Sequence, residues 1–249
     1  MMKKLGYIAL ITGLIACGGE NANDCFQVSG NVVQQQVEVT PFDRILVNEG
    51  IEMTIQEGID YEVIITAGEN LLNDVRVEVV DNQLVLSNNN TCNFFRSYAP
   101  VKMHVTAPNI TEIRSSTQFD IHSEGILTYP QLSILSEDYS GNYLNSGNFY
   151  LTINNTSFTL TFNNLSNCFI SGETESLTVG FYGGNSRFEG ATLLAKQVNV
   201  FHRSANDIIV YPVESLQGNI YSTGNVIAVN IPPVVNVTEH YKGKLIFQN

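Results

Sequence analysis

The sequence predicts an all-β protein in which an N-terminal β region leads into a right-handed parallel β-helix, a solenoid with coils of about 20 residues. Two patterns predict this fold. Apolar and polar residues alternate with a period of two in the first half of the chain, and a short apolar motif returns at nearly constant spacing in the second half. From residue 30 to residue 249 no helical apolar period lasts for three turns. A β-sandwich with irregular hairpins is the alternative fold.

Residues 1–16 are typical of an export signal rather than of a folded element. Lys3 and Lys4 form a basic start, and an apolar run of about 11 residues follows from Leu5 to Ile15. A helix that spans a membrane needs about 20 apolar residues, whereas the apolar part of a signal peptide has about 7–15. The sequence therefore predicts a signal peptide over residues 1–16.

The residues that end this segment resemble the bacterial lipobox. Leu14-Ile15-Ala16-Cys17 has its order of leucine, variable residue, small residue and cysteine. In proteins with that signal the cysteine is lipidated and becomes the first mature residue, and several acyl chains together give stable membrane anchoring. The resemblance predicts lipidation of Cys17, followed by a tether over residues 17–30. An ordinary signal peptide followed by a structural cysteine is the alternative.

Location and charge limit the partners of the mature chain. Gly18 stands where the best-known inner-membrane retention signal has aspartate, so the predicted location is the cell envelope, at the outer membrane, facing either the periplasm or the outside. Loss of residues 1–16 leaves ten basic residues against 24 acidic ones, a formal net charge of −14. This balance argues against nucleic acid as a partner, because nucleic acid needs a basic surface.

Three cysteines remain beyond the anchor. Export permits disulfides, and Cys25 and Cys92 are the candidates for a bridge that would pin the N-terminus; whether they are bridged stays open. Cys168 lies next to Phe169 and is expected to be a small buried residue. Because no Cys-X-X-Cys pair occurs and the four histidines are far apart in sequence, the sequence predicts no metal site and no cofactor.

Residues 31–109 form the predicted N-terminal β region. Turn residues such as glycine and asparagine separate its alternating segments. The strands are expected at Ile51–Ile55, Tyr61–Ile65, Val75–Val79, Leu84–Leu86 and Val101–Val105.

Residues 110–249 carry the predicted repeats. The apolar motif starts at Leu132, Leu151, Leu177, Val198, Leu216 and Val235, with successive starts 19, 26, 21, 18 and 19 positions apart. We attribute the long separation to an insertion around Asn163 to Glu175. A second inward position is expected at Tyr143, Phe188, Ile208, Val226 and Leu245. Such repeats are typical of stacked coils that bury a shared apolar column, and asparagines at the turns are expected to bond along the stack.

The chain also resembles a known family of Bacteroidetes lipoproteins. Pro41-Phe42-Asp43-Arg44-Ile45-Leu46-Val47, Gly50 to Gly58, Ala107-Pro108-Asn109-Ile110 and Gly243 to Phe247 are similar to the "putative auto-transporter adhesin, head GIN domain" family. The resemblance covers about residues 40–249. It implies a β-helical fold, placement at the cell surface, and one continuous unit over residues 31–249. It supplies no binding residues.

The sequence favours binding over catalysis. Candidate catalytic groups are Glu137 with Asp138, Glu173 with Glu175, and His202-Arg203 with Asp207, but each acidic pair is also typical of a solvated turn, and no hydrolase motif accompanies them. We therefore predict no catalytic residues and a surface module that binds a carbohydrate or a protein. The predicted contact patch is Tyr139, Tyr143 and Tyr182, because tyrosine combines apolar area with a hydroxyl group. A polysaccharide-active enzyme and a passive structural component of the envelope are the alternatives.

Overall fold

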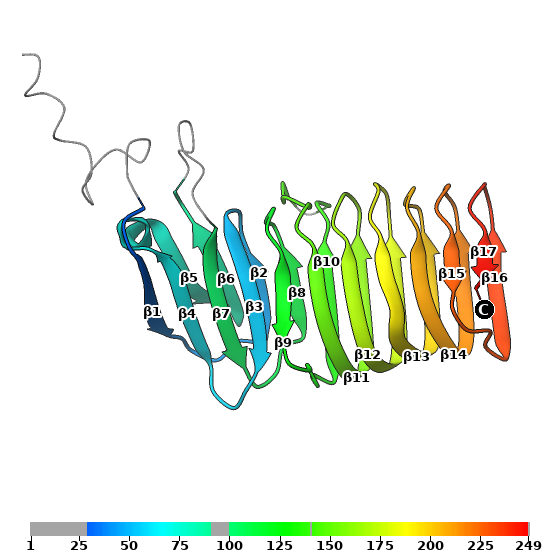
Figure 1. Ribbon diagram of the computed structural model, residues 1–249, viewed down its shortest axis with the longest axis horizontal. Helices are drawn as coiled ribbons and strands as arrows, with labels where there is room; N and C mark the ends of the chain where they lie inside the picture. The colour runs from blue at the N-terminus through cyan, green and yellow to red at the C-terminus, as the bar shows by residue number, and fades with distance from the viewer. Residues whose placement is uncertain (1–28, 91–99, 140, 249) are drawn as a thin grey trace, which may run out of the picture.

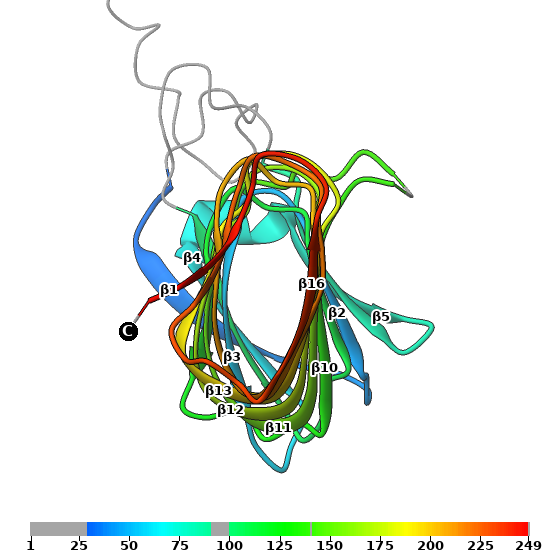
Figure 2. The same ribbon diagram turned by 90° about the vertical axis from the view of Figure 1, so that its right-hand side faces the viewer.

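The computed structural model describes residues 29–90, 100–139 and 141–248. Within these residues, 17 strands form a single mixed sheet that winds around one apolar core, so the all-β prediction is confirmed. Figure 1 shows the strands side by side along an elongated body, and Figure 2, seen along the long axis, shows that they enclose an oval interior.

The five strands predicted from the alternating segments before residue 110 are all present, and further strands precede and follow them. In chain order they are β1 (Val32–Glu38), β2 (Arg44–Val47), β3 (Ile51–Glu57), β4 (Glu62–Gly68), the 3₁₀ helix η1 (Glu69–Asp74), β5 (Val75–Val80), β6 (Gln83–Asn88), β7 (Val101–Ala107), β8 (Glu112–Ser115), β9 (Ile121–Glu124), β10 (Gln131–Ser136), β11 (Phe149–Phe162), β12 (Cys168–Phe181), β13 (Phe188–His202), β14 (Ile208–Ile220), β15 (Val226–Ala228), β16 (Val234–Glu239) and β17 (Leu245–Phe247).

Two long sides make up the body. Side A consists of β7, β3 and β9, the first parts of β11 to β14, and β15 and β17; side B consists of β6, β2, β8 and β10, the second parts of β11 to β14, and β16. Phe149 pairs with Cys168, Cys168 with Phe188, and Phe188 with Ile208, all in parallel. From β11 onward, equivalent residues of successive coils therefore lie about 20 positions apart, as the repeats predict.

The long coil lies elsewhere than the sequence suggested. Leu132 pairs with Phe158, 26 positions later, and Phe158 pairs with Leu177, 19 positions later. The extra length therefore belongs to the turn between β10 and β11, residues 137–148, and the expected insertion around Asn163 to Glu175 is wrong. The cause is that each coil has one apolar motif on each side: the motif at Leu151 lies on side A, and the equivalent of Leu132 is Phe158.

The N-terminal strands join the same stack out of sequence order. β2 lies between β6 and β8, and β3 lies between β7 and β9, with parallel pairing on both edges of each strand. Antiparallel strands complete this end: β4 pairs with β1 and β7, and β5 pairs with β6.

Inward side chains form continuous columns. The first and third residues of four of the motifs are at most 3% exposed, as expected of a shared apolar column: Leu132, Ile134, Leu151, Ile153, Leu177, Val179, Val198 and Val200. The motif of the last coil differs, since Val235 is 42% exposed. In a side A column, Cys168 is a free, fully buried thiol between Phe149 and Phe188, as expected of a small apolar residue. The column member of the preceding coil is Phe149; Tyr143, expected there, lies in the long turn. Each fully buried large side chain contributes about 1.5–3 kcal/mol.

A polar ladder aligns the coils at the turn that precedes side A. The residue before each strand bonds to its equivalent in the next coil: the backbone and side-chain nitrogens of Asn148 donate to Asp120 Oδ1 at 3.1 and 3.2 Å, and those of Asn167 donate to Asn148 Oδ1 at 3.2 and 2.9 Å. Asn225 repeats the arrangement on Asp207 Oδ1 at 2.9 and 3.1 Å. These bonds satisfy turn groups that strand pairing leaves free, and they fit the expected stacking of asparagines.

Candidate functional site

A row of rings runs along the turn that follows side B. We call Tyr139, Tyr182, Phe201, Tyr221 and His240 the corner strip. The ring centroids are 6.2 Å apart for Tyr139 and Tyr182, 4.8 Å for Tyr182 and Phe201, 5.2 Å for Phe201 and Tyr221, and 4.2 Å for Tyr221 and His240. Tyr221 and His240 are equivalent residues of successive coils, since each directly follows one of the paired residues Ile220 and Glu239. Phe201 instead pairs with Gly180 and Asn219 within the sheet. Tyr139 and Tyr182 follow β10 and β12, between which β11 lies.

The structure brings two of the three predicted patch residues together. Tyr139 is 66% exposed and Tyr182 is 43% exposed, and their rings meet edge to face. Tyr143 lies apart from them and is half-buried, with the guanidinium of Arg114 over its ring at 4.9 Å. Arg114 in turn donates to Glu137 at 2.6 Å. The exposed patch is therefore the pair Tyr139 and Tyr182, and Tyr143 supports the turn beside it.

The acidic residues considered for catalysis take part in local contacts. Glu137 is 6% exposed, pairs with Arg114 and accepts the backbone N–H of Tyr139 at 2.7 Å. Asp138 accepts a 2.6 Å bond from Asn163. Glu175 pairs with Lys196 at 2.6 Å on the surface, and this hydrogen bond raises the pKa of Lys196. Glu137 and Asp138 lie in the turn after β10 and Glu175 lies within β12, and all three contacts join neighbouring coils.

His202 and Asp207 also have structural surroundings. His202 continues a side B column between Phe181 and Ile220, and burial lowers the pKa of its fully buried imidazole to about 4. Asp207 belongs to the polar ladder and lies 3.5 Å from Arg187. Among the described residues, no group of three or more histidine, cysteine, aspartate or glutamate side chains is arranged to hold a metal ion.

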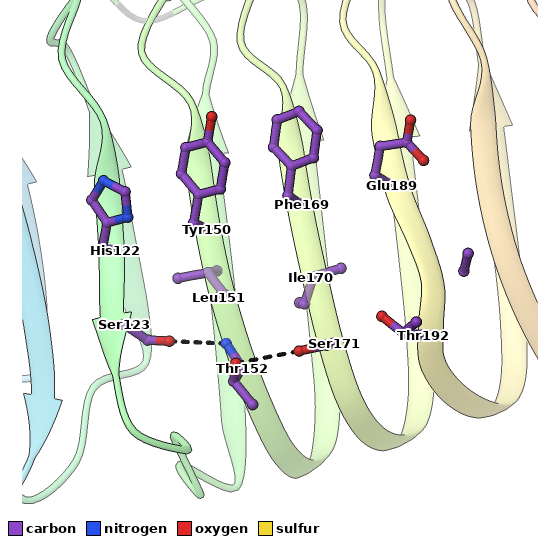
Figure 3. A pocket seen from close by; sticks show the side chains of 11 residues that line it. His122, Ser123, Tyr150, Leu151, Thr152, Phe169, Ile170, Ser171, Glu189 and Thr192 are labelled. Atoms are coloured by element: carbon purple, nitrogen blue, oxygen red, sulfur yellow. Dashed lines mark hydrogen bonds between the residues drawn. The ribbon is translucent and has the colours of Figure 1, made fainter.

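Side A carries a shallow groove that the sequence did not reveal (Figure 3). Its volume is about 550 Å³. The rings of His122, Tyr150 and Phe169 stand in a row on its wall, with centroids 4.9 Å apart in each pair and planes within 8° of parallel. Below them lies a row of hydroxyl groups, those of Ser123, Thr152 and Ser171. Ser123 Oγ accepts the backbone N–H of Thr152 at 2.9 Å.

The groove has polar groups beside its rings. Thr152 and Ser171 share a hydroxyl–hydroxyl bond of 3.3 Å, and the Glu189 carboxylate follows Phe169 in the next coil. Sequence reasoning missed this row because it needs the correct register: each ring directly follows the first inward residue of its coil, at Ile121, Phe149 and Cys168.

Several predicted features lie outside the described residues. These are the signal peptide over residues 1–16, the lipidation site Cys17, and both cysteines of the proposed bridge, Cys25 and Cys92. Across the part of the chain that the structure describes, no helix has the length and apolar character needed to cross a membrane.

Comparisons with known proteins give a family and a fold. The model of the family described as "putative auto-transporter adhesin, head GIN domain" matches residues 41–232. No curated protein matches the chain. A solved Bacteroides fragilis structure described as a putative adhesin is 18% identical, with a TM-score of 0.78 over 88% of this chain and 97% of that chain.

Two further solved structures are similar. A putative adhesin of Parabacteroides merdae is 14% identical, with a TM-score of 0.64 over 88% of this chain and 98% of that one. A Parabacteroides distasonis protein described as a putative lipid binding protein is 16% identical, with a TM-score of 0.56 over 87% of this chain and 97% of that one. At these identities the likeness concerns the fold alone.

Proposed function

The chain belongs to the family described as "putative auto-transporter adhesin, head GIN domain", and we propose that it is a lipid-anchored, non-catalytic binding module of the cell envelope. Its partner in this proposal is a carbohydrate or a protein. Residues 31–249 act as one continuous unit, wound as a right-handed parallel β-helix. The lipid on Cys17 holds this unit at the outer membrane, where the family's description as adhesins fits a role in contact with the surroundings.

The corner strip carries the proposal. It places an exposed pair of tyrosines, Tyr139 and Tyr182, on turns that the polar ladder and the buried columns hold in fixed positions. A rigid array of exposed rings binds with a small loss of side-chain freedom, which favours recognition of an extended partner. The local contacts of Glu137, Asp138 and Asp207 assign those carboxylates to the turns and favour binding over catalysis.

A binding array tests the partner class. We expect the purified protein to bind at least one glycan or extracellular-matrix protein saturably, and the double variant Tyr139→Ala/Tyr182→Ala to weaken that binding. Tyr143→Ala is measured separately, because its ring supports Arg114 and its loss can disturb the turn. Tyr241→Ala, which removes an exposed tyrosine outside the corner strip, is the matched control. Unchanged affinity in the double variant removes the patch from the proposal, and turnover of a polysaccharide would favour the enzyme alternative.

The anchor has its own test. Cys17→Ser should abolish incorporation of labelled palmitate and release the protein from the membrane fraction. If the unchanged protein takes up no label, Cys17 is not lipidated, and the proposed attachment fails independently of the binding result.

A further inference from the structure

The groove on side A has the chemistry of a sugar site. We propose that it binds a neutral saccharide, with sugar rings packed on Tyr150 and Phe169 and sugar hydroxyls bonded to Glu189 and the row of hydroxyls below. The inference rests on the proposed function, because it names one partner class for the binding module. It places that partner on side A, away from the corner strip.

The rings leave part of each face open. Their planes are within 8° of parallel and their centroids are 4.9 Å apart. Parallel rings at the contact spacing of about 3.5 Å, with centroids this far apart, are displaced sideways by about 3.4 Å, like overlapping tiles. Tyr150 remains 36% exposed, and Figure 3 shows the rings projecting outward from neighbouring strands. Tiled faces of this kind suit the C–H faces of sugar rings.

Hydrogen-bonding groups flank the rings on two sides. Glu189 is bound through Oε1 to Arg187 at 2.5 Å, and its Oε2 has no hydrogen-bond partner within the described residues, so it can accept from a sugar hydroxyl. The hydroxyl groups of Thr152 and Ser171 both donate and accept. An apolar wall with a few fixed polar groups is the usual composition of a small-molecule site.

Charge selects a neutral ligand. The described residues that line the groove include no lysine or arginine, and Glu189 is the one carboxylate among them. Arg187, the cation beside Glu189, is already paired with that carboxylate and does not line the groove. A phosphate, sulfate or uronate would therefore meet a carboxylate and no cation of its own among the lining residues. A neutral saccharide meets no such cost.

Backbone pairing argues against an extended peptide. The groove lies on the face of β9, β11, β12 and β13, and these strands pair with one another on both sides of a single register shift between Phe169 and Ser171. A peptide that adds a strand needs an open sheet edge, which this face does not offer.

The rings of the corner strip are less open to a sugar than those of the groove. Arg203 lies over the rings of Phe201 and Tyr221, at 6.0 and 5.8 Å from their centroids.

Titration with defined polysaccharides tests the site. The probes are dextran, mannan and galactan as neutral polymers, with heparin and polygalacturonate as anionic ones, measured by isothermal calorimetry. We expect at least one neutral polymer to bind, and Tyr150→Ala and Phe169→Ala each to weaken it about tenfold, a change of about 1.4 kcal/mol. Glu189→Gln should weaken it less, because the amide still bonds. Tyr241→Ala should leave it unchanged.

The outcomes separate this inference from the proposed function. Thermal melting identifies any variant that fails to fold; Tyr150→Leu then replaces Tyr150→Ala, because it keeps apolar area without a ring. Three outcomes overturn the saccharide site. They are absence of binding by all three neutral polymers, tighter binding of the anionic polymers than of the neutral ones, and an affinity in both ring variants equal to that of the unchanged protein. If an array partner is lost in Tyr139→Ala/Tyr182→Ala but not in Tyr150→Ala, the binding module stands and the side A site falls.

Discussion

The regular coils from β11 to β17 and the N-terminal end from β1 to β7 belong to one sheet, but contacts of different range hold them together. In the regular coils, each residue pairs with partners about 20 positions away, such as Phe158 with Leu177. At the N-terminal end, Arg44 pairs with Gln83 and Glu112, which are 39 and 68 positions away. The regular coils therefore resemble a one-dimensional array of neighbours, whereas β2 and β3 tie together segments that are distant in sequence.

This difference predicts where stability is shared and where it is local. A stack with contacts only between neighbours can lose its last coil while the rest stays folded. β2 and β3 are each paired on both edges with segments distant in sequence, so neither strand can unfold without breaking the hydrogen bonds to both neighbours. We therefore expect mutations at the N-terminal end to act on the whole fold and mutations near β16 and β17 to act on a few coils.

The largest expected effect comes from a core position in β2. Ile45→Ala removes buried methyl groups between Leu84 and Ile113 and should lower the free energy of global unfolding by about 2–5 kcal/mol. Ile220→Ala is the comparison in the outer coils. Urea denaturation combined with hydrogen exchange should show global loss for the first variant and faster exchange confined to β14 and beyond for the second. Equal global losses would remove the distinction between the two regions.

A pH effect is expected in the regular coils. Burial lowers the pKa of His202 to about 4 from 6.5, with Asp207 partly opposing the shift. Because the folded protein keeps the neutral imidazole, this contribution to stability is complete above about pH 6.5 and is lost as the pH falls toward 4, up to about 3 kcal/mol.

His202→Phe isolates this titration from that of the carboxylates. Phenylalanine occupies the equivalent positions in two preceding coils, at Phe162 and Phe181. The variant should lose less stability between pH 7.5 and 4.5 than the unchanged protein, measured by urea midpoints. Parallel losses in the two proteins would mean that His202 does not contribute to the pH dependence.

A smaller effect is expected in the polar ladder. Asn167→Ala removes the acceptor of the Arg187 N–H and the amide donor to Asn148 and should cost about 1–2 kcal/mol. Asn154→Ala is the control, because Asn154 is exposed and its hydrogen bond to Leu127 uses only the backbone. A loss of similar size in both variants, measured by thermal melting, would mean that the ladder adds nothing beyond ordinary turn contacts.

The smallest effect is expected on the surface. Lys196 and Glu175 are paired at 2.6 Å, but their side chains are 52% and 58% exposed. Exposed pairs of this kind contribute little, because solvent and salt screen them. Lys196→Ala should leave the melting temperature within experimental error at both low and high salt. A salt-dependent drop in the melting temperature would show that this pair stabilises the contact between β12 and β13.

The sequence could predict what depends on neighbouring coils. The all-β class, the spacing of the repeats and the inward positions of Leu132 and Val179 all follow from local alternation and from the distance between one coil and the next. The register near Leu151 could not be read in this way, because each coil has two similar apolar motifs on opposite sides. The insertion of β2 and β3 between later strands leaves no local pattern at all, since pairing between segments this distant in sequence adds nothing to periodicity.

The candidate functional site also depends on contacts that local spacing in the sequence could not place. Tyr139 and Tyr143 both lie in the irregular turn from 137 to 148. The repeats therefore could not show that Tyr139 meets Tyr182 across the coil of β11, or that Tyr143 packs against Arg114 instead. The rings of His122, Tyr150 and Phe169 are separated by 28 and 19 positions, so their alignment appears only once the long coil is correctly placed.

The enclosure of β3 between β7 and β9 has a mechanical consequence when the protein is held at its N-terminus and pulled from its C-terminus. Within the described residues β17 pairs only with β15, so a pull on the C-terminus meets a single ladder at first. The coils should then unravel one at a time, and a coil of about 19 residues extends by at most about 65 Å. Pulling a single molecule should record repeated steps of that length, followed by one rupture at much higher force as β3 is sheared from both neighbours together.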